Sequence, residues 1–536
     1  MRRILVGGFA LPVLALASCP VSLAQGLAGS TPWDACVASP TRACILDEAL
    51  LRTLALAPAA PAQLGEIAEA QAAAGNIETA PRVAHSIAPD QKSRVTALRA
   101  IATAQASLGS THEATETFIE AHRLAVSLPD RLSGGEALLA VAQAEASAGM
   151  NKEAAAIFAE SLSLAQTVEI RPASVCVISF SPEDRVDGLL KALAQQQARA
   201  GNIFDALKIA RSVKYNLQVR VDALRAIAEM HAQNGMLGEA GPILKEAVEA
   251  ARAMLTPPEP RPSCPGAHYM PASAEFLIDI LATISRAQAK AGQAGDAANT
   301  IEIALQLVPA ITDGPLWKAD VARSMALSAI AEAQSDVGLK PQSAGSLARA
   351  EAAALEVGEP KHRIMALIRL AQAQYRNDRV NASADTFDQA RAIARSLDNM
   401  AERANALLNI VDAKVELGLT TDAEIILAGA LETTRSIPDK SKRVFWLSRI
   451  AKAQQKAGRL QDGIATYAEA LDAVDATNPE LQRTNALFLI IRGWPGLPLD
   501  TRLLAASAPH AVRIADSIYE KRRPEALVVI AKALSN

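Results

Sequence analysis

Aromatic residues are scarce in this sequence. Phe, Trp and Tyr together make up 3% of its 536 residues, although hydrophobic residues make up 50%. The apolar side chains are therefore mostly Ala and Leu, which favour helices and allow them to pack closely. Runs in which β-branched and polar residues alternate, the usual sign of a strand, are also scarce. The composition predicts an all-α protein.

The sequence also lacks an excess of basic charge and a long apolar run outside its start. Its 54 Lys and Arg residues are interspersed with 57 Asp and Glu residues, and the formal net charge is −3. A protein that binds nucleic acid would show a basic stripe, so we expect no nucleic-acid partner. No later run reaches about 18 apolar residues, so no transmembrane segment is predicted.

Motifs of catalysis and cofactor binding are missing as well. The sequence contains no G-x-S-x-G, no H-E-x-x-H, no Walker loop and no G-x-G-x-x-G with an acidic partner. None of the seven His residues has a second His and a Cys or carboxylate at the spacing of a metal site. We therefore predict no catalytic, cofactor-binding or metal-ligating residue and no enzyme activity. Two carboxylates brought together by the fold are the alternative.

The first 24 residues have the pattern of an export signal. Arg2 and Arg3 precede an apolar run, and Ser22-Leu23-Ala24 places small residues at both positions that determine cleavage. The sequence thus predicts a signal peptide over 1–24. Alternatively, Leu16-Ala17-Ser18-Cys19 resembles the lipobox of bacterial lipoproteins, in which Cys19 would carry a lipid anchor. Either reading places the mature protein outside the cytoplasm, in a bacterial periplasm or on the outer membrane.

The rest of the chain repeats one pattern. A Gly closes each copy, with Asp378 in its place once, and Leu stands eleven positions earlier in all ten copies. An apolar residue such as Ile101 or Ile330 follows that Leu by three positions, which is the spacing of one helix face. After the Gly, Ala recurs at five and twelve positions and a larger residue at nine. The pattern predicts two helices joined by a left-handed turn, for which Gly is suited. The turn residues are Gly75, Gly109, Gly149, Gly201, Gly235, Gly292, Gly338, Asp378, Gly418 and Gly458.

These positions resemble the tetratricopeptide (TPR) repeat, which has large apolar, small, Gly, Ala, aromatic and Ala residues at the same offsets. The resemblance covers about 64–475 and implies a right-handed α-solenoid of antiparallel helix hairpins. The spacing is often 40 residues rather than the 34 typical of the family. We expect an N-terminal segment and capping helix over 25–60, the repeat array over 61–475, and a degenerate repeat with a C-terminal capping helix over 476–536.

A second departure from the TPR pattern is a Gln four positions before most turns, where the family usually has an aromatic residue. The Gln side chains could form a polar ladder for a ligand. They could instead satisfy backbone groups at turns or between helices, and this second interpretation is favoured. His231 stands in the same slot, and we expect it to pack rather than to bind a metal.

Four cysteines remain after Cys19, an even number that suits an oxidising compartment. Cys176 and Cys264 stand in two Pro-rich insertions that follow second helices, so both should emerge at one edge of the solenoid. We therefore favour the disulfides Cys36–Cys44 and Cys176–Cys264. Free thiols are the alternative for the second pair and a zinc site for the first.

In TPR proteins the first helices line a concave groove, and this resemblance implies which residues could contact a partner. The front half offers basic candidates and the rear half more apolar ones. A peptide with an acidic end and an apolar portion would complement such a groove. The alternative is that these residues are solvated or pack against neighbours. The candidates are Arg99, Lys191, Arg225, Arg286, Lys290, Met365, Ile368, Tyr375, Leu408 and Phe445.

From these observations we expect a non-catalytic protein–protein interaction scaffold of the bacterial cell envelope. It would bind a peptide or partner protein on the concave face and need no cofactor. An envelope enzyme active on peptidoglycan or polysaccharide is one alternative. A structural lipoprotein tether is another, favoured if Cys19 is lipidated.

Overall fold

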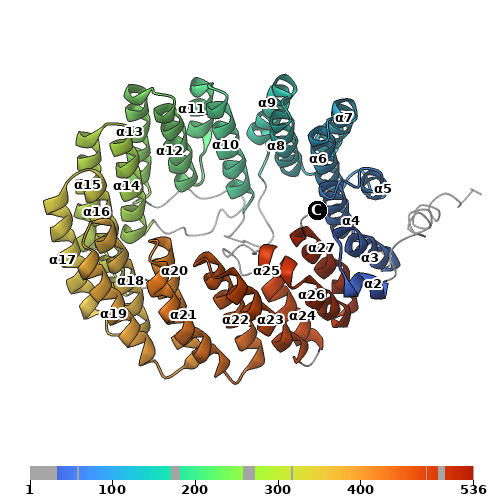
Figure 1. Cartoon of the computed structure of the whole chain (residues 1–536). Helices are drawn as coiled ribbons and strands as arrows, with labels where there is room; N and C mark the ends of the chain where they lie inside the picture. Colours follow the sequence, from blue (N-terminus) through green and yellow to red (C-terminus); the bar gives the residue numbers. More distant parts are fainter. Residues whose placement is uncertain are drawn as a thin grey trace, which may run out of the picture. The chain divides into compact units, whose positions relative to one another are not determined.

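The computed structural model describes residues 33–56, 60–170, 181–256, 272–314, 318–477, 480–492 and 501–534. Every regular element among these residues is a helix (Figure 1), so the predicted all-α fold is confirmed. By their contacts the helices form two compact units. One comprises Met1–Leu128 with Pro479–Asn536, and the other comprises Pro129–Asn478. None of the described helices is both long and apolar enough to cross a membrane.

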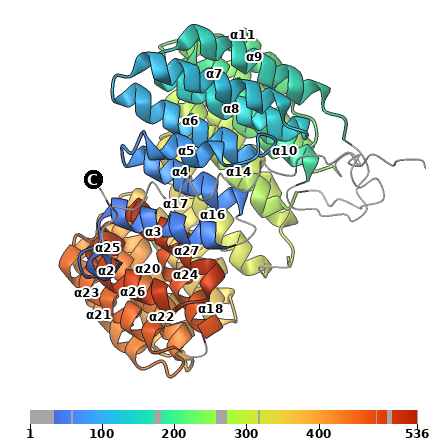
Figure 2. The same cartoon turned by 90° about the vertical axis from the view of Figure 1, so that its right-hand side faces the viewer.

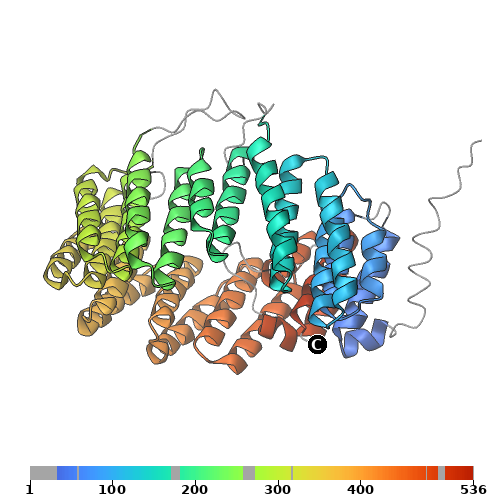
Figure 3. The ribbon, with the colours of Figure 1, turned by 90° about the horizontal axis from the view of Figure 1, so that it is seen from above.

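The larger unit is a row of eight antiparallel helix hairpins, seen from above in Figure 3. The two helices of each hairpin pack together, and each first helix also packs on the first helix of the next hairpin. This unbroken row is the predicted solenoid. The hairpins are α8 (Arg131–Ser147) with α9 (Asn151–Thr167), α10 (Pro182–Arg199) with α11 (Ile203–Ser212), α12 (Leu217–Gln233) with α13 (Leu237–Ala253), α14 (Ala274–Lys290) with α15 (Ala294–Leu307), α16 (Ala319–Asp336) with α17 (Lys340–Glu356), α18 (Pro360–Arg376) with α19 (Val380–Arg395), α20 (Met400–Glu416) with α21 (Thr420–Arg435), and α22 (Lys440–Lys456) with α23 (Leu460–Asp475).

The turn inside each hairpin depends on one left-handed residue. Among the described residues, φ is positive at the nine predicted glycines, between 76° and 86°, and at Asp378, where it is 61°. All ten predicted turn positions are therefore confirmed. The amide of the residue that follows the left-handed one then donates a hydrogen bond back to the end of the first helix. For example, Leu339 N donates to the Gln334 carbonyl oxygen at 2.7 Å. This hydrogen bond satisfies a carbonyl that the helix end would leave unpaired.

The repeated apolar positions form the core. The Leu eleven positions before each turn is buried in every copy, and wherever Ala stands five positions after the turn it is buried as well. Full burial of one Leu stabilises the fold by roughly 1.5–3 kcal/mol. The alanines add little burial of their own, but their small side chains let the two helices of a hairpin approach closely.

The smaller unit combines helices from both ends of the sequence. Its N-terminal part has two hairpins of the predicted register behind two leading helices. Its C-terminal part keeps the 40-residue spacing, since Leu487 and Leu527 are fully buried like Leu447. The helices are α2 (Trp33–Ala38), α3 (Arg42–Ala55), α4 (Pro61–Ala73), α5 (Thr79–His85), α6 (Lys92–Ser107), α7 (Thr111–Ser127), α24 (Glu480–Ile491), α25 (Thr501–Ala506), α26 (Ala508–Ser517) and α27 (Arg523–Ala533).

Helix α27 packs against α3 and α4, and α26 against α2, as Figures 1 and 2 both show. Ion pairs join the same segments: Arg52 Nη1 lies 2.6 Å from Asp516 Oδ1, and Lys532 Nζ lies 3.7 Å from Glu69 Oε2. The sequence led us to expect α3 and α27 as capping helices at opposite ends of the solenoid. In the structure each covers the apolar face of the other.

We predict that replacing Gly418 or Gly429 by Ala changes the stability of the protein in opposite directions, because the two glycines differ in their backbone angle φ. A Cβ at either position would meet no atom within 4 Å, but only Gly418 has a left-handed backbone, with φ of 76°. Gly418→Ala should destabilise the protein by about 1–2 kcal/mol. Gly429→Ala, inside α21, should stabilise it by about 0.5–1 kcal/mol. Urea unfolding followed by circular dichroism measures both, and equal effects would contradict the role of the turn.

We also predict that Leu527→Ala loosens α3, although α3 lies at the other end of the sequence. The lost burial should destabilise the smaller unit by about 2–5 kcal/mol. Hydrogen exchange should then speed up in α3 and stay unchanged in α20 and α22. Leu447→Ala, the same change in the same repeat slot, is the matched control and should loosen α22 and the helices packed on it while leaving α3 unchanged. Unchanged protection of α3 in the Leu527 variant would show that α27 does not hold it.

Candidate functional site

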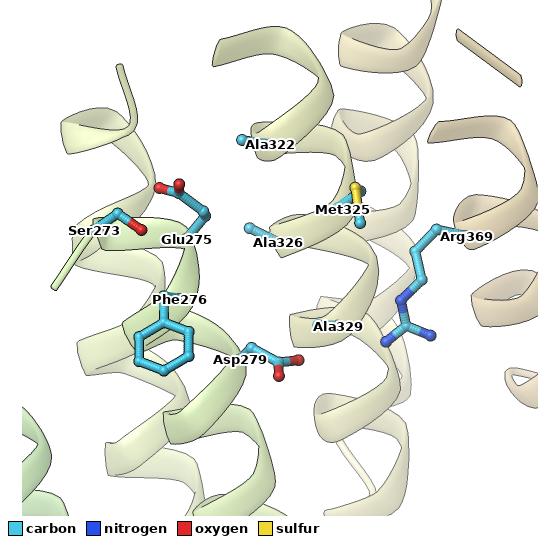
Figure 4. A pocket seen from close by; sticks show the side chains of 9 residues that line it. All are labelled: Ser273, Glu275, Phe276, Asp279, Ala322, Met325, Ala326, Ala329 and Arg369. Carbon is cyan, nitrogen blue, oxygen red and sulfur yellow. The ribbon is translucent and has the colours of Figure 1, made fainter. Parts of the chain in front are cut away.

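The first helices α14, α16 and α18 form a hollow of about 360 Å³ (Figure 4). Most of its wall is apolar and comes from α16, whose residues 322, 325, 326 and 329 share one face at helical spacing. Helix α14 contributes two carboxylates and an aromatic ring, and α18 contributes one guanidinium. The lining residues are Ser273, Glu275, Phe276, Asp279, Ala322, Met325, Ala326, Ala329 and Arg369.

A buried carboxylate holds the three helices together next to this hollow. Glu332 of α16 is 2% exposed, and its Oε1 lies 2.8 Å from Arg369 Nη1 of α18. Its Oε2 lies 3.0 Å from Arg376 Nη1 and 3.8 Å from Arg286 Nη1 of α14. A buried carboxylate is stable only when cations and hydrogen bonds compensate its charge, and these arginines supply both. The pairs therefore fix the guanidinium of Arg369 at the edge of the hollow.

One further acid and one further base extend this cluster. Partial burial raises the pKa of Asp336, Arg286 lowers it, and the Glu332 carboxylate raises it. Lys290, one of the predicted groove residues, is exposed and lies close enough to Asp336 to lower the same pKa. The charges of this cluster around Glu332 thus largely compensate one another within the protein.

The other basic residues predicted to face a partner are also paired. Lys191 Nζ lies 3.1 Å from Asp222 Oδ2, and Arg225 Nη1 lies 2.7 Å from Glu229 Oε1. In the smaller unit, Arg99 Nη2 lies 3.7 Å from Glu69 Oε1. The side chains are about one-third exposed, so they lie at the surface, but their charges are compensated. The predicted basic front segment does not amount to an uncompensated basic surface.

Two apolar candidates are placed differently from the prediction. Ile368 is 9% exposed and Leu408 is 1% exposed, and both pack in one core cluster with neighbouring first helices. The prediction that they face a ligand is wrong. Tyr375, Phe445 and Met365 are partly exposed, and the Phe445 ring lies 4.5 Å from that of Trp446.

Only one of the two predicted cysteine pairs lies within the described residues. Cys36 of α2 and Cys44 of α3 lie with their Sγ atoms 2.09 Å apart, as in a disulfide. Cys44 also stands at the start of α3, where its amide donates to Thr41 Oγ1 at 3.3 Å. Cys19, Cys176 and Cys264 lie outside the described residues.

The Gln slot has a structural role, as the favoured interpretation held, but its partners are side chains rather than backbone groups. The Oε1 atoms of Gln105, Gln288 and Gln374 each accept from a Thr hydroxyl twelve positions later, at 2.7–2.9 Å. Each bond joins the two helices of one hairpin. His231 in this slot is buried, and in the described part of the chain its Nδ1 has no hydrogen-bond partner. Within that part, no three His, Cys, Asp or Glu side chains converge to hold a metal.

Two more hollows lie along the repeats. One, of about 460 Å³, lies between the first helices α4 and α6 of the smaller unit and includes Glu69 and Arg99. The other, of about 700 Å³, lies near the turns of the α10–α11 and α12–α13 hairpins and includes His231 and the 80% exposed Phe204. The hollow on α14, α16 and α18 differs from both in its mainly apolar wall.

The ion pairs between first helices follow a spacing that the sequence analysis missed. An acid six positions before one turn pairs with an Arg nine or ten positions before the next turn. Examples are Glu69 with Arg99, Glu332 with Arg369, and Asp412 with Arg449. Comparing the polar positions across repeats would have found this signal. Phe276 and Asp279 carry no such signal, because they stand near the start of a helix where the repeats differ.

Comparisons with known proteins give a limited result. No protein family matches the sequence, and no curated protein matches it. A kinesin-light-chain-like array of nearly identical TPR-like repeats from Podosopora anserina is 15% identical, with coverage of 38% of this chain and 98% of that chain and a TM-score of 0.24. Ton1535 from Thermococcus onnurineus NA1 is 17% identical over 72% and 98%, with a TM-score of 0.28. The quorum sensor NprR from B. thuringiensis is 11% identical over 71% and 98%, with a TM-score of 0.23. Scores this low carry no argument, so the TPR-like description rests on the hairpins and turns themselves.

We predict that Glu332 is required for stability, whereas an exposed acid in the same row of helices is not. Glu332→Ala leaves three arginines near one another without their counter-charge, and should destabilise the protein by about 3 kcal/mol, because the arginines remain partly solvated. Glu402→Ala removes a partner of Lys361 at 3.0 Å in which both side chains are over one-third exposed. The Glu402 substitution should lower the free energy of unfolding by less than about 1 kcal/mol. Urea midpoints compare the two variants, and equal losses would contradict the role of burial.

Proposed function

We propose that this protein is a non-catalytic protein–protein interaction scaffold of the bacterial cell envelope. It binds a peptide segment of a partner protein on its first helices, with the hollow on α14, α16 and α18 as the main contact. The export pattern over 1–24 supports the envelope location, and the placement of Cys36 beside Cys44 agrees with an oxidising compartment. The intact mass of the mature protein distinguishes cleavage after Ala24 from lipidation of Cys19.

The observation that carries this proposal is the apolar wall of the hollow. Ligand sites are concave, mainly apolar and bordered by a few polar groups that set orientation. The wall formed by Met325 and the alanines of α16 has this character, and Glu275, Asp279 and Arg369 border it. A volume of about 360 Å³ is near the lower limit for ligand sites, so it accommodates one or two side chains of a longer partner.

The rows of hairpins explain why such a partner would be a protein. Most residues of the repeat are used in packing the helices, and the surface left along the first helices is extended. The ion pairs between neighbouring first helices hold that surface in place. A rigid surface loses little entropy on binding, so a short apolar contact can be sufficient for recognition.

We predict that peptide binding depends on Phe276. The purified full-length mature protein is screened against a random peptide display library, and bound peptides are measured by fluorescence anisotropy. Phe276→Ala should weaken the selected peptides about tenfold or more, because a buried aromatic contact is typical of binding hot spots. Phe276 is 37% exposed, so its loss should leave the fold intact.

Phe204→Ala is the matched control, because it makes the same change at an 80% exposed Phe on the second helix α11. Its effect should be less than twofold. Loss of binding in the Phe204 variant alone would move the site to the hollow near the turns. No selected peptide at all would refute the proposed function.

A further inference from the structure

Two carboxylates of α14 line the hollow. Within the described part of the chain, Glu275 and Asp279 of α14 have neither an ion-pair partner nor a side-chain hydrogen bond. They are four positions apart, so they lie on the same side of the helix. Both line the hollow, and in Figure 4 the Asp279 carboxylate points toward the Arg369 side of the hollow while the Glu275 carboxylate points the other way. Like charges at this spacing disfavour the helix slightly. A cation near them would reduce that repulsion.

The arginine of the hollow does not supply this cation. Both terminal nitrogens of Arg369 bond to Glu332, with Nη1 2.8 Å from Oε1 and Nη2 3.3 Å from Oε2. Its charge is therefore shared with a buried carboxylate. The charged side chains that α14 contributes to the lining of the hollow, Glu275 and Asp279, are both negative.

The remaining surface suits a side chain with an apolar stem and a cationic head. The alanines and Met325 of α16 offer an apolar wall for methylene groups, and Phe276 stands about one helical turn before Asp279 on α14 (Figure 4). A cation within about 6 Å of an aromatic ring is attracted by the ring face. Lys and Arg have this build, because their long stems pack on apolar surface while the head stays with polar groups.

We propose that the hollow recognises a basic residue, Lys or Arg, next to an apolar residue in a segment of the partner protein. The basic head lies against the Asp279 carboxylate, with Glu275 as a second negative charge on the same helix, and the apolar neighbour packs on the wall of α16. This rests on the proposed function and names the chemistry of its ligand. It differs from the acidic peptide that the sequence led us to expect, because the basic residues behind that expectation are paired within the protein.

The test uses synthetic peptides from the selection that differ at one position. Each pair carries either Lys or norleucine, which has a similar stem without the charge, at the basic position. Full-length protein should bind the Lys peptide about fivefold or more tightly, because partly exposed ion pairs contribute modestly each. The preference should shrink between about 50 mM and about 300 mM salt, since screening weakens exposed charges.

The double variant Glu275→Gln and Asp279→Asn should remove the preference for Lys and leave the norleucine peptide bound as before. Glu302→Gln, an exposed acid on the second helix α15 of the same hairpin, is the control and should keep the preference. An unchanged preference in the double variant overturns the inference.

The outcomes separate this inference from the proposed function. Selected peptides that depend on Phe276 but show no basic residue overturn the inference and leave the scaffold in place. The absence of any peptide bound by the wild type refutes the scaffold itself. Self-association that the double variant abolishes, seen by sedimentation at rising concentration, would make a second copy the occupant and overturn the peptide assignment.

Discussion

The left-handed residue between the two helices of each hairpin is the constraint on which the rest of the structure depends. It reverses the chain within three residues, so the apolar stripes of both helices face each other at once. The stripe of the first helix then extends to the neighbouring hairpin, and the row grows by repetition. Asp378 shows that the conformation rather than the residue type is kept, because it adopts the same positive φ.

The hollow arises where one helix departs from the pattern of its neighbours. Helix α16 carries Ala322 and Ala329 at positions where α14 has Phe276 and Thr283 and α18 has His362 and Arg369. Small side chains flanked by larger ones leave a depression whose wall is apolar. Beside this depression, the buried ion pairs of Glu332 join α16 to both α14 and α18.

The sequence was sufficient to predict the hairpins, because the turn residue and the apolar positions of the helices recur in ten copies. An ambiguous position in one copy can be assigned from the same position in the others. Prediction of the exposed face was less successful, and the failure has a geometric cause. Ile368 precedes Arg369 by one position, a rotation of about 100° around the helix. Arg225, Ile368 and Leu408 all stand ten positions before the turn of their repeat. A long basic side chain such as that of Arg225 reaches the surface from this position, whereas Ile368 and Leu408 are too short and stay in the core. The contact between α3 and α27 had no signal, since a repeat pattern describes neighbours only.

That contact also sets the order of events during synthesis. The last residue of α3 is Ala55, and α27 begins 468 positions later at Arg523. At about 5–20 residues per second, a ribosome needs roughly half a minute or more to cover this distance. Hairpins whose contacts are local can form as they emerge, but the apolar face of α3 must wait for the end of the chain. During that interval it is open to aggregation, so the first helices made are the last to be completed.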